Sequence, residues 1–184
     1  MDSALVKPYR DTVLSVRQQV TDVFLPFYAA TPPLAPAAPA WRGGDTLFAV
    51  WIGINDVGNS FFGGDEATAP LYSRILAVYA DLLGRLHAAG ARNFALLNVP
   101  PVDRSPLTAG QGREAQALER AAIAAFNRGV DALARGVGRG RREGANVWVV
   151  DAHGLFAKAL DDPRAFEATA GYRNVTGFCE SYQK

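Results

Sequence analysis

Three short apolar runs, separated by two long amphipathic segments, constrain the fold of this chain more than any other feature. The runs cover residues 46–52 (TLFAVWI), 93–99 (NFALLNV) and 146–150 (NVWVV), and they are rich in residues that favour β-strands. Apolar runs without polar alternation are typical of strands that are buried on both faces of a parallel sheet. We therefore expect three strands of one parallel sheet.

The segments around these runs carry helical spacing of apolar side chains. The predicted helices cover residues 10–24, ended near Pro26, then 69–89, 113–137 and a short stretch at 155–160, while the proline-rich residues 31–40 predict a surface connection. Strands that alternate with helices indicate an α/β fold, here a three-layer α/β/α sandwich with a parallel sheet. Residues 1–184 have the length of a single domain. Because such sheets usually contain more than three strands, the pattern predicts an incomplete sandwich.

Composition excludes several classes of function. Nineteen Lys and Arg against 18 Asp and Glu give a net charge of +1, which argues against nucleic-acid or anionic-membrane binding. One cysteine, Cys179, and two histidines allow neither an internal disulfide nor a Cys/His zinc site, so we expect no metal and no cofactor. No apolar run is long enough to span a membrane, and the first residues do not resemble a signal peptide.

The first predicted strand is followed by Gly53-Ile54-Asn55-Asp56, which lies where functional groups gather in a parallel sheet, beyond the carboxyl end of a strand. Glycine permits a tight exit from the strand. An asparagine amide at that position can donate a hydrogen bond to the oxyanion of a tetrahedral intermediate. From these residues alone, the favoured alternative is that Asn55 and Asp56 shape a turn and cap the following loop, because such residues are common in turns.

The residues 47–56 (LFAVWIGIND) resemble block III of the GDSL/SGNH hydrolases, whose core is Gly-x-Asn-Asp. Three later segments are similar to that family in the same order: the Pro-Pro stretch 98–106, the helix from Arg113 that contains Asn127, and the tail 171–179. Within that family, the chain most resembles the fungal branch grouped as family-16 carbohydrate esterases, or acetyl esterases. The resemblance implies a flavodoxin-like SGNH fold and ester hydrolysis through a serine acyl-enzyme, without a cofactor.

Only part of the machinery that this resemblance implies matches residues of the chain. Asn55 matches the oxyanion-hole asparagine, with Gly53 as its structural neighbour and Asp56 completing the motif. The family's nucleophile stands in an N-terminal Gly-Asp-Ser block and its base in a C-terminal Asp-x-x-His block, and neither block is found. We therefore expect a fragment that lacks both blocks and has little or no activity of its own.

The serines and histidines of the chain are the possible substitutes for the missing groups. Ser3 follows Asp2, but no strand precedes this pair, so it cannot form a nucleophile elbow. Ser60 and Ser105 fit loop and turn positions. His153 follows the third predicted strand as Asp151-Ala152-His153 and is a candidate base, against the alternative of a local turn contact. His87 fits a surface position near a helix end.

The sequence thus predicts a hydrolase of the GDSL/SGNH class that acts on a small-molecule or carbohydrate ester. The alternative is a noncatalytic binding domain that uses the sheet rim around Asn55. An unrelated flavodoxin-like module is disfavoured, because no loop has the glycine content of a phosphate cradle. The sequon Asn174-Val175-Thr176 predicts N-glycosylation, consistent with an extracellular full-length relative. An unpaired edge at residues 46–52 predicts self-association.

Overall fold

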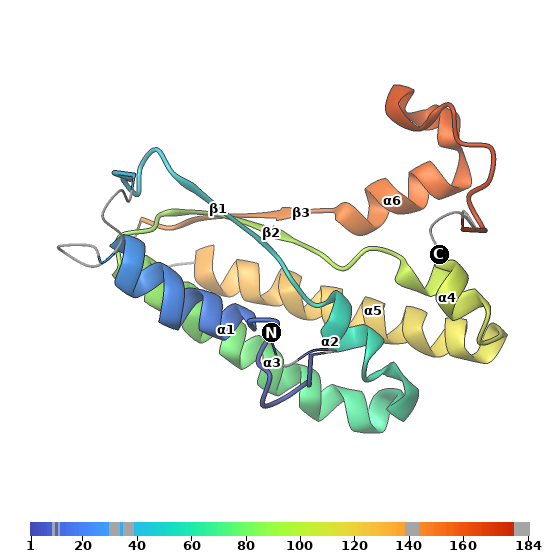
Figure 1. Cartoon of the computed structure of the whole chain (residues 1–184), viewed down its shortest axis with the longest axis horizontal. Helices are drawn as coiled ribbons and strands as arrows, with labels where there is room; N and C mark the ends of the chain where they lie inside the picture. The colour runs from blue at the N-terminus through green and yellow to red at the C-terminus, as the bar shows by residue number, and fades with distance from the viewer. Residues whose placement is uncertain (9, 11, 30–33, 35–38, 139–143, 179–184) are drawn as a thin grey trace.

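The computed structural model describes residues 1–184 except 9, 11, 30–33, 35–38, 139–143 and 179–184, so Cys179 lies outside the described residues. Its sheet contains β1 (Leu47–Trp51), β2 (Asn93–Leu97) and β3 (Asn146–Val150) in the order β1-β2-β3, with both pairs parallel. The parallel α/β architecture predicted from the sequence is confirmed (Figure 1).

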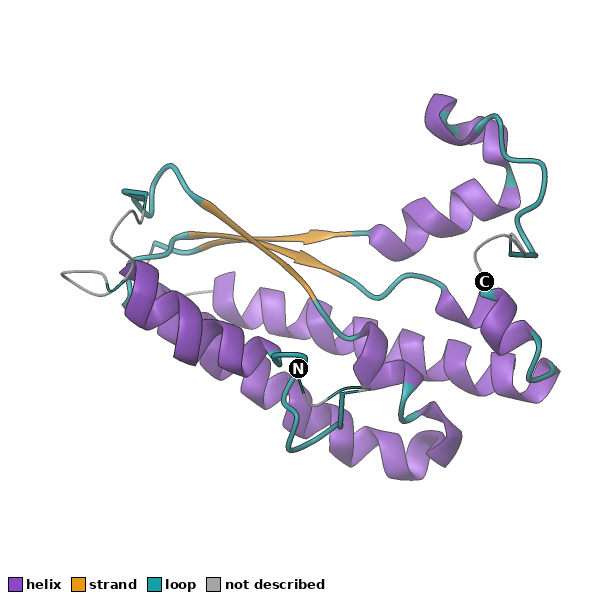
Figure 2. Ribbon diagram, viewed as in Figure 1, coloured by secondary structure: helices purple, strands orange, loops and turns teal. Residues whose placement is uncertain are grey.

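Two long helices, α3 (Gly64–Ala88) and α5 (Arg113–Gly136), pack against each other beneath one face of the sheet (Figures 1 and 2). The remaining helical elements are shorter. They are α1 (Val16–Gln18), η1 (Gln19–Ala29), α2 (Ile54–Gly58), η2 (Phe61–Gly63), η3 (Val102–Arg104), α4 (Pro106–Ala109), α6 (Ala152–Asp161), η5 (Pro163–Ala165) and η6 (Glu167–Thr169). No described helix is both long and apolar enough to cross a lipid bilayer.

The first helical region differs from its predicted span of 10–24. It begins at Val16, because Ser15 and Gln18 form a reciprocal capping box. It then continues as the π-helix η1 through Pro26 to Ala29. Aromatic packing holds η1 on the sheet: the Phe24 ring lies 5.4 Å from the Phe48 ring of β1. This packing outweighs the local tendency of Pro26 to end a helix.

The second helix begins earlier than predicted, at Gly64 instead of residue 69. Asp65 and Glu66 lie in its first turn, where negative charge favours the positive end of the helix dipole. By contrast, the helix predicted for residues 113–137 matches α5, and the strand predicted for 146–150 matches β3.

The core lies between the sheet and the two long helices. Register pairs place Phe48 and Phe94, and likewise Val50 and Leu96, side by side on the face that meets the helices. The Phe94 and Leu96 side chains are fully buried, as are Phe126 of α5 and Ile75 of α3. The helix layer therefore covers the sheet face that carries Phe94 and Leu96.

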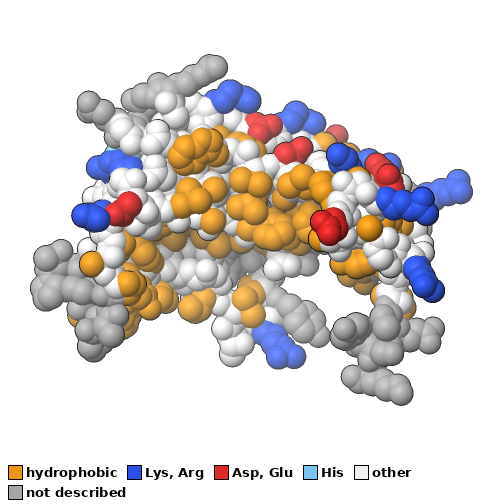
Figure 3. All heavy atoms as spheres, turned by 90° about the horizontal axis from the view of Figure 1, so that it is seen from above, with side chains coloured by type: hydrophobic (Ala, Val, Ile, Leu, Met, Phe, Trp, Pro, Cys, Tyr) orange, Lys and Arg blue, Asp and Glu red, His pale blue; other side chains and the backbone are white. Residues whose placement is uncertain are grey.

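The opposite face of the sheet corrects the expectation of burial on both faces for β1 and β3, whereas the three central residues of β2 are buried as expected. Leu47, Trp51 and Trp148 are exposed by 58%, 47% and 52%, and exposure alternates along β1 and β3. Figure 3 views this face and shows hydrophobic side chains gathered across it. Helix α6 reaches only its end, where Phe156 contacts Trp51 at 6.2 Å between ring centroids. Among the described residues, the second helical layer of a sandwich does not cover this face.

Because β1 is an edge strand of the described sheet, we expect this chain to self-associate. Substituting Leu47→Lys together with Trp148→Lys should shift the protein toward monomer in sedimentation velocity, because lysine opposes strand pairing and apolar contact. The matched control is Leu107→Lys, since Leu107 is 76% exposed on α4, away from the sheet. A wild-type chain that sediments as a monodisperse monomer would contradict this expectation.

Candidate active site

The loop after β1 is built around Gly53, which has φ +114° and precedes the short helix α2. This left-handed conformation favours glycine. The space around it also excludes a side chain: a Cβ at this position would lie 2.5 Å from Cε1 of Phe126 and 2.8 Å from Cγ2 of Val99. Gly53 therefore lets β1 end directly against α5, and this contact sets the position of Asn55.

Val99, the second neighbour of Gly53, is fixed by an asparagine of α5. The Asn127 side chain accepts a hydrogen bond from the Val99 backbone N–H at 2.8 Å and donates one to the Val99 carbonyl at 2.9 Å. These two bonds replace the ladder partners that the backbone loses where β2 ends. An ion pair holds the Pro-Pro segment that follows on α5: the buried Asp103 carboxylate pairs with Arg120 at 2.9 Å. The resemblance pointed to the helix that contains Asn127, and the structure shows that Asn127 fixes the backbone just after β2.

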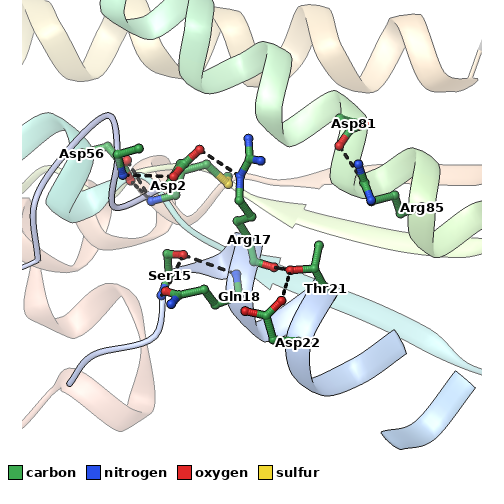
Figure 4. A network of polar contacts seen from close by, with 11 residues as sticks. Asp2, Ser15, Arg17, Gln18, Thr21, Asp22, Asp56, Asp81 and Arg85 are labelled. Atoms are coloured by element: carbon green, nitrogen blue, oxygen red, sulfur yellow. Dashed lines mark hydrogen bonds and ion pairs between the residues drawn. The ribbon is translucent and has the colours of Figure 1, made fainter. Parts of the chain in front are cut away.

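Asp56 points away from the open side of the loop and into the protein. Its carboxylate is 1% exposed and accepts hydrogen bonds from the Met1 amino group at 2.8 and 3.0 Å. The adjacent Asp2 pairs with Arg17 of α1 at 2.9 Å, and Figure 4 shows Asp2, Arg17 and Asp56 in one polar network. Asp56 thus anchors the loop by charge and leaves its neighbour Asn55 at the surface.

Asn55 is exposed, and its amide makes no hydrogen bond to the part of the chain that the structure describes. It borders two pockets. One, of about 170 Å³, is lined in part by Ser3, Ile52 and the N-terminal segment. The other, of about 400 Å³, lies among α2, η2, α4 and α5. A carboxamide with an unused N–H donor between two pockets is suited to bind a developing negative charge.

The serines near Asn55 hold structural positions. Ser60 donates its hydroxyl proton to the Asp56 carbonyl at 2.6 Å and lies 3.2 Å from the Tyr72 hydroxyl. Ser105 caps α4, accepting a hydrogen bond from the Thr108 backbone N–H. Ser3 lines the smaller pocket with Asn55, but the described residues that line that pocket include no histidine. The loop and turn positions expected for Ser60 and Ser105 are those observed.

His153 lies in the first turn of α6, beyond the carboxyl end of β3, and lines neither pocket beside Asn55. Its backbone N–H donates to Oδ1 of Asn98 at 2.7 Å. Asp151 caps α6 through Gly154 and accepts a bond from the Asn98 amide. The Asn98 amide, the Gly154 N–H and the nearby His153 together hold the pKa of Asp151 below its ordinary value. In the sheet, β2 lies between β3, which precedes His153, and β1, which precedes Asn55. The strand order therefore does not place His153 next to Asn55, and a base role for His153 stays a prediction.

The other predicted positions lie outside this region. His87 is in the last turn of α3. Asn174 is exposed, and its side-chain oxygen accepts bonds from Thr176 and Gly177, so glycosylation there stays a prediction. Across the described residues, no group of three or more His, Cys, Asp or Glu side chains is arranged to hold a metal ion.

Sequence reasoning missed Glu119, a carboxylic acid on the buried face of α5. It is 3% exposed, and its Oε2 has no hydrogen-bond partner among the described residues. Burial raises the pKa of the Glu119 carboxyl; a hydrogen bond from Thr108 offsets part of that rise, and the Asp103 carboxylate adds to it. A signal was present, since Glu119 falls on the apolar stripe with Ala115, Ala122 and Phe126.

Comparison with known proteins assigns the family. The family model described as GDSL-like Lipase/Acylhydrolase matches residues 12–174. The chain belongs to this family, and its fold is the α/β fold of SGNH hydrolases. It is 36% identical over 170 residues to an acetylesterase of Thermothelomyces thermophilus, covering 91% of the chain and 53% of that protein.

Two further relatives are more distant. The chain is 30% identical over 145 residues to a thermolabile hemolysin of Vibrio parahaemolyticus, covering 79% of the chain and 31% of that protein. It is 29% identical over 171 residues to a GDSL esterase/lipase of Arabidopsis thaliana, covering 88% of the chain and 46% of that protein. The chain therefore spans about half the length of these relatives, or less.

The crowding at Gly53 predicts the effect of adding one methyl group. Gly53→Ala should lower the free energy of unfolding by at least about 2 kcal/mol, because alanine is strained at this φ and its Cβ would clash with Phe126. Urea unfolding followed by circular dichroism measures the change. Gly136→Ala is the control, since a Cβ there meets no atom within 4 Å. Equal stability of the two variants would show that the loop after β1 can move away from α5.

The buried acid predicts a pH-dependent change in stability. An acid whose pKa is raised by folding stabilises the fold at low pH and loses that contribution as the pH rises through the raised value. Glu119→Met should therefore increase the free energy of unfolding by about 1 kcal/mol at pH 8 and by less at pH 4. Denaturant midpoints at the two pH values test this. A destabilised variant at pH 8 would mean that the carboxyl has a stabilising partner.

Proposed function

We propose that this chain supplies the oxyanion-binding and substrate-binding part of a hydrolase that acts on carboxylic esters, with Asn55 as the oxyanion donor. The observation that carries the proposal is the exposed side-chain amide of Asn55, which lies between two pockets and has no hydrogen-bond partner in the part of the chain that the structure describes; Gly53 and the buried Asp56 position it. Membership of the GDSL-like lipase/acylhydrolase family supports the ester as the substrate class. An acetylesterase among the relatives supports a small acyl group.

In ester hydrolysis, a nucleophile adds to the acyl carbon and the carbonyl oxygen becomes an oxyanion. The N–H of the Asn55 side chain would donate a hydrogen bond to that oxygen. Such a donor contributes most when it is oriented before the reaction, because no reorganisation is then needed in the transition state. The packing at Gly53 and the ion pair of Asp56 hold the backbone on either side of Asn55 in place, which supports this role.

A nucleophile and a base are not brought together beside Asn55 by the described residues. Ser60 and Ser105 serve as hydrogen-bond and capping groups, and His153 lies beyond β3. For this polypeptide we therefore expect only the weak acceleration that binding and an oxyanion donor give without a catalytic triad. We further propose a small-molecule or carbohydrate ester as the substrate.

The proposal is tested with 4-nitrophenyl acetate and the purified chain. We expect a small rate above the buffer reaction that falls at least about tenfold in Asn55→Ala, because one oxyanion donor is worth about 10²–10³ in complete sites. The matched control is Asn174→Ala, because Asn174 is an exposed asparagine that lines neither pocket beside Asn55.

Two results would count against this assignment. A rate that is equal in wild type and Asn55→Ala would remove the oxyanion role of Asn55. Turnover that disappears in Asn55→Ala and also in one serine variant, such as Ser3→Ala, would show that this chain carries its own nucleophile.

A further inference from the structure

Asn55 lines two pockets, so an ester whose carbonyl oxygen accepts a hydrogen bond from its amide can direct its two ends into different surroundings. The smaller pocket, of about 170 Å³, lies between the N-terminal segment, α1 and the residue that follows β1. The larger, of about 400 Å³, lies among α2, η2, α4 and α5. The lining of each pocket indicates which end of an ester it can accept.

Apolar side chains form most of the wall of the smaller pocket. They come from segments that are far apart in the sequence, and they are Val6, Pro8, Val13, Leu14, Val16 and Ile52. Val6, Val16 and Ile52 also pack against the hydrophobic core, which holds this part of the wall in place. An alkyl group that enters the pocket would lose its contact with water against these side chains.

Two polar side chains of the same pocket already have partners within the protein. Asp56 accepts both of its hydrogen bonds from the Met1 amino group. The Ser15 hydroxyl is bonded to the Gln18 side chain at 2.9 Å, as Figure 4 shows. Neither group needs a ligand to satisfy it.

The remaining polar side chains of the smaller pocket offer little to a polar ligand. The Gln19 amide donates to the Leu14 carbonyl at 3.0 Å, while Ser3 and Lys7 are exposed, where water satisfies them. A ligand in this pocket therefore meets an apolar wall and the amide of Asn55. This combination fits the carbonyl and the alkyl chain of an acyl group.

The larger pocket differs in its polar groups. The side chains of Asn59 and Gln111 line it and are exposed, and their amides make no hydrogen bond within the described ranges of the chain. An amide offers both donors and an acceptor, so these two groups can bind a polar alcohol portion. The two ends of the ester are thereby distinguished, with the acyl group in the smaller pocket.

The volume of the smaller pocket sets the length of the acyl group. A cavity of about 150 Å³ holds a benzene ring, so one of about 170 Å³ accepts a chain of about four to six carbon atoms. An acetyl group would leave most of the apolar wall uncovered. Each further CH₂ that is buried strengthens binding about fourfold, which favours the longer chain.

We propose that the smaller pocket binds the acyl portion of the ester, and that this portion is an alkyl chain of about four to six carbon atoms, longer than acetyl. This inference rests on the proposed ester hydrolase function and narrows its substrate class by acyl length. Leu14, which is 46% exposed and lines the pocket, is a specificity-determining residue, because its side chain limits the space for the chain.

Hexanamide and acetamide test the proposal, because a primary amide has a carbonyl group and an alkyl chain but no ester. Titration of the full chain, followed by ¹H–¹⁵N chemical shifts, should give saturable shifts at residues 13–16 and at the Asn55 side chain. Hexanamide should bind at least about tenfold more tightly than acetamide. Since this binding requires no reaction, its outcome is separate from that of the 4-nitrophenyl acetate assay.

Leu14→Trp adds bulk to the smaller pocket and should weaken hexanamide binding at least about fivefold, because it removes the space for one or two CH₂ groups. Acetamide binding should not change. Val13→Trp, at a second exposed position of the same pocket, should act in the same way. The matched control is Leu107→Trp, because Leu107 is also an exposed leucine and lines only the larger pocket. A thermal melt of each variant separates lost binding from lost folding.

Three results would overturn the proposal. The first is equal affinity for the two amides, or no binding of hexanamide by the wild type. The second is a set of shifts confined to residues 102–111, which would place the alkyl chain in the larger pocket. The third is hexanamide binding that Leu107→Trp weakens while Leu14→Trp and Val13→Trp leave it unchanged.

Discussion

The contact between Gly53 and α5 is the constraint on which the arrangement of this protein depends most. Strand β1 ends where its backbone touches the Phe126 ring and the Val99 side chain, leaving no room for a Cβ. Because that backbone also adopts a left-handed conformation, the chain can turn at once into α2. Asn55 follows two residues later, so its place at the sheet rim results from a packing contact in the core. A polar residue of the site is thereby positioned by apolar ones.

Helix α5 connects the core to the site. One side of it buries Phe126 and Val130 against the sheet, and neighbouring positions fix the loops that surround Asn55. Asn127 holds the end of β2, and Arg120 pairs with Asp103 in the Pro-Pro segment. Glu119 faces the pocket on the same helix. A rigid helix that carries core, loop and pocket residues keeps the pocket shape stable, because any shift of the site would also disturb the core.

Much of this could be predicted from the sequence, since the relevant signals are local. The apolar runs predicted the three strands within one or two residues, and the spacing in 113–137 predicted α5. The residue types at 53–56, with the resemblance to the GDSL/SGNH hydrolases, indicated Asn55, and membership of that family is established. The first helix was placed less well: its start depends on the Ser15–Gln18 box, and its end on aromatic contacts with distant Phe48. The burial of β1 on both faces was wrong, because residue type cannot show whether a second layer covers a strand.

Local order was therefore determined by the sequence alone: parallel strands that alternate with helices, a glycine exit from β1, and an asparagine just beyond it. The tertiary structure decided which faces are covered and which polar groups find partners. The Met1 amino group anchors Asp56, and Asp151 and His153 hold Asn98. One carboxyl oxygen of Glu119 has no partner within the described ranges. Each of these facts depends on residues far away in the chain. The physical reason is that burial and hydrogen bonding are properties of neighbours in space, whereas periodicity and backbone preference are properties of neighbours in sequence.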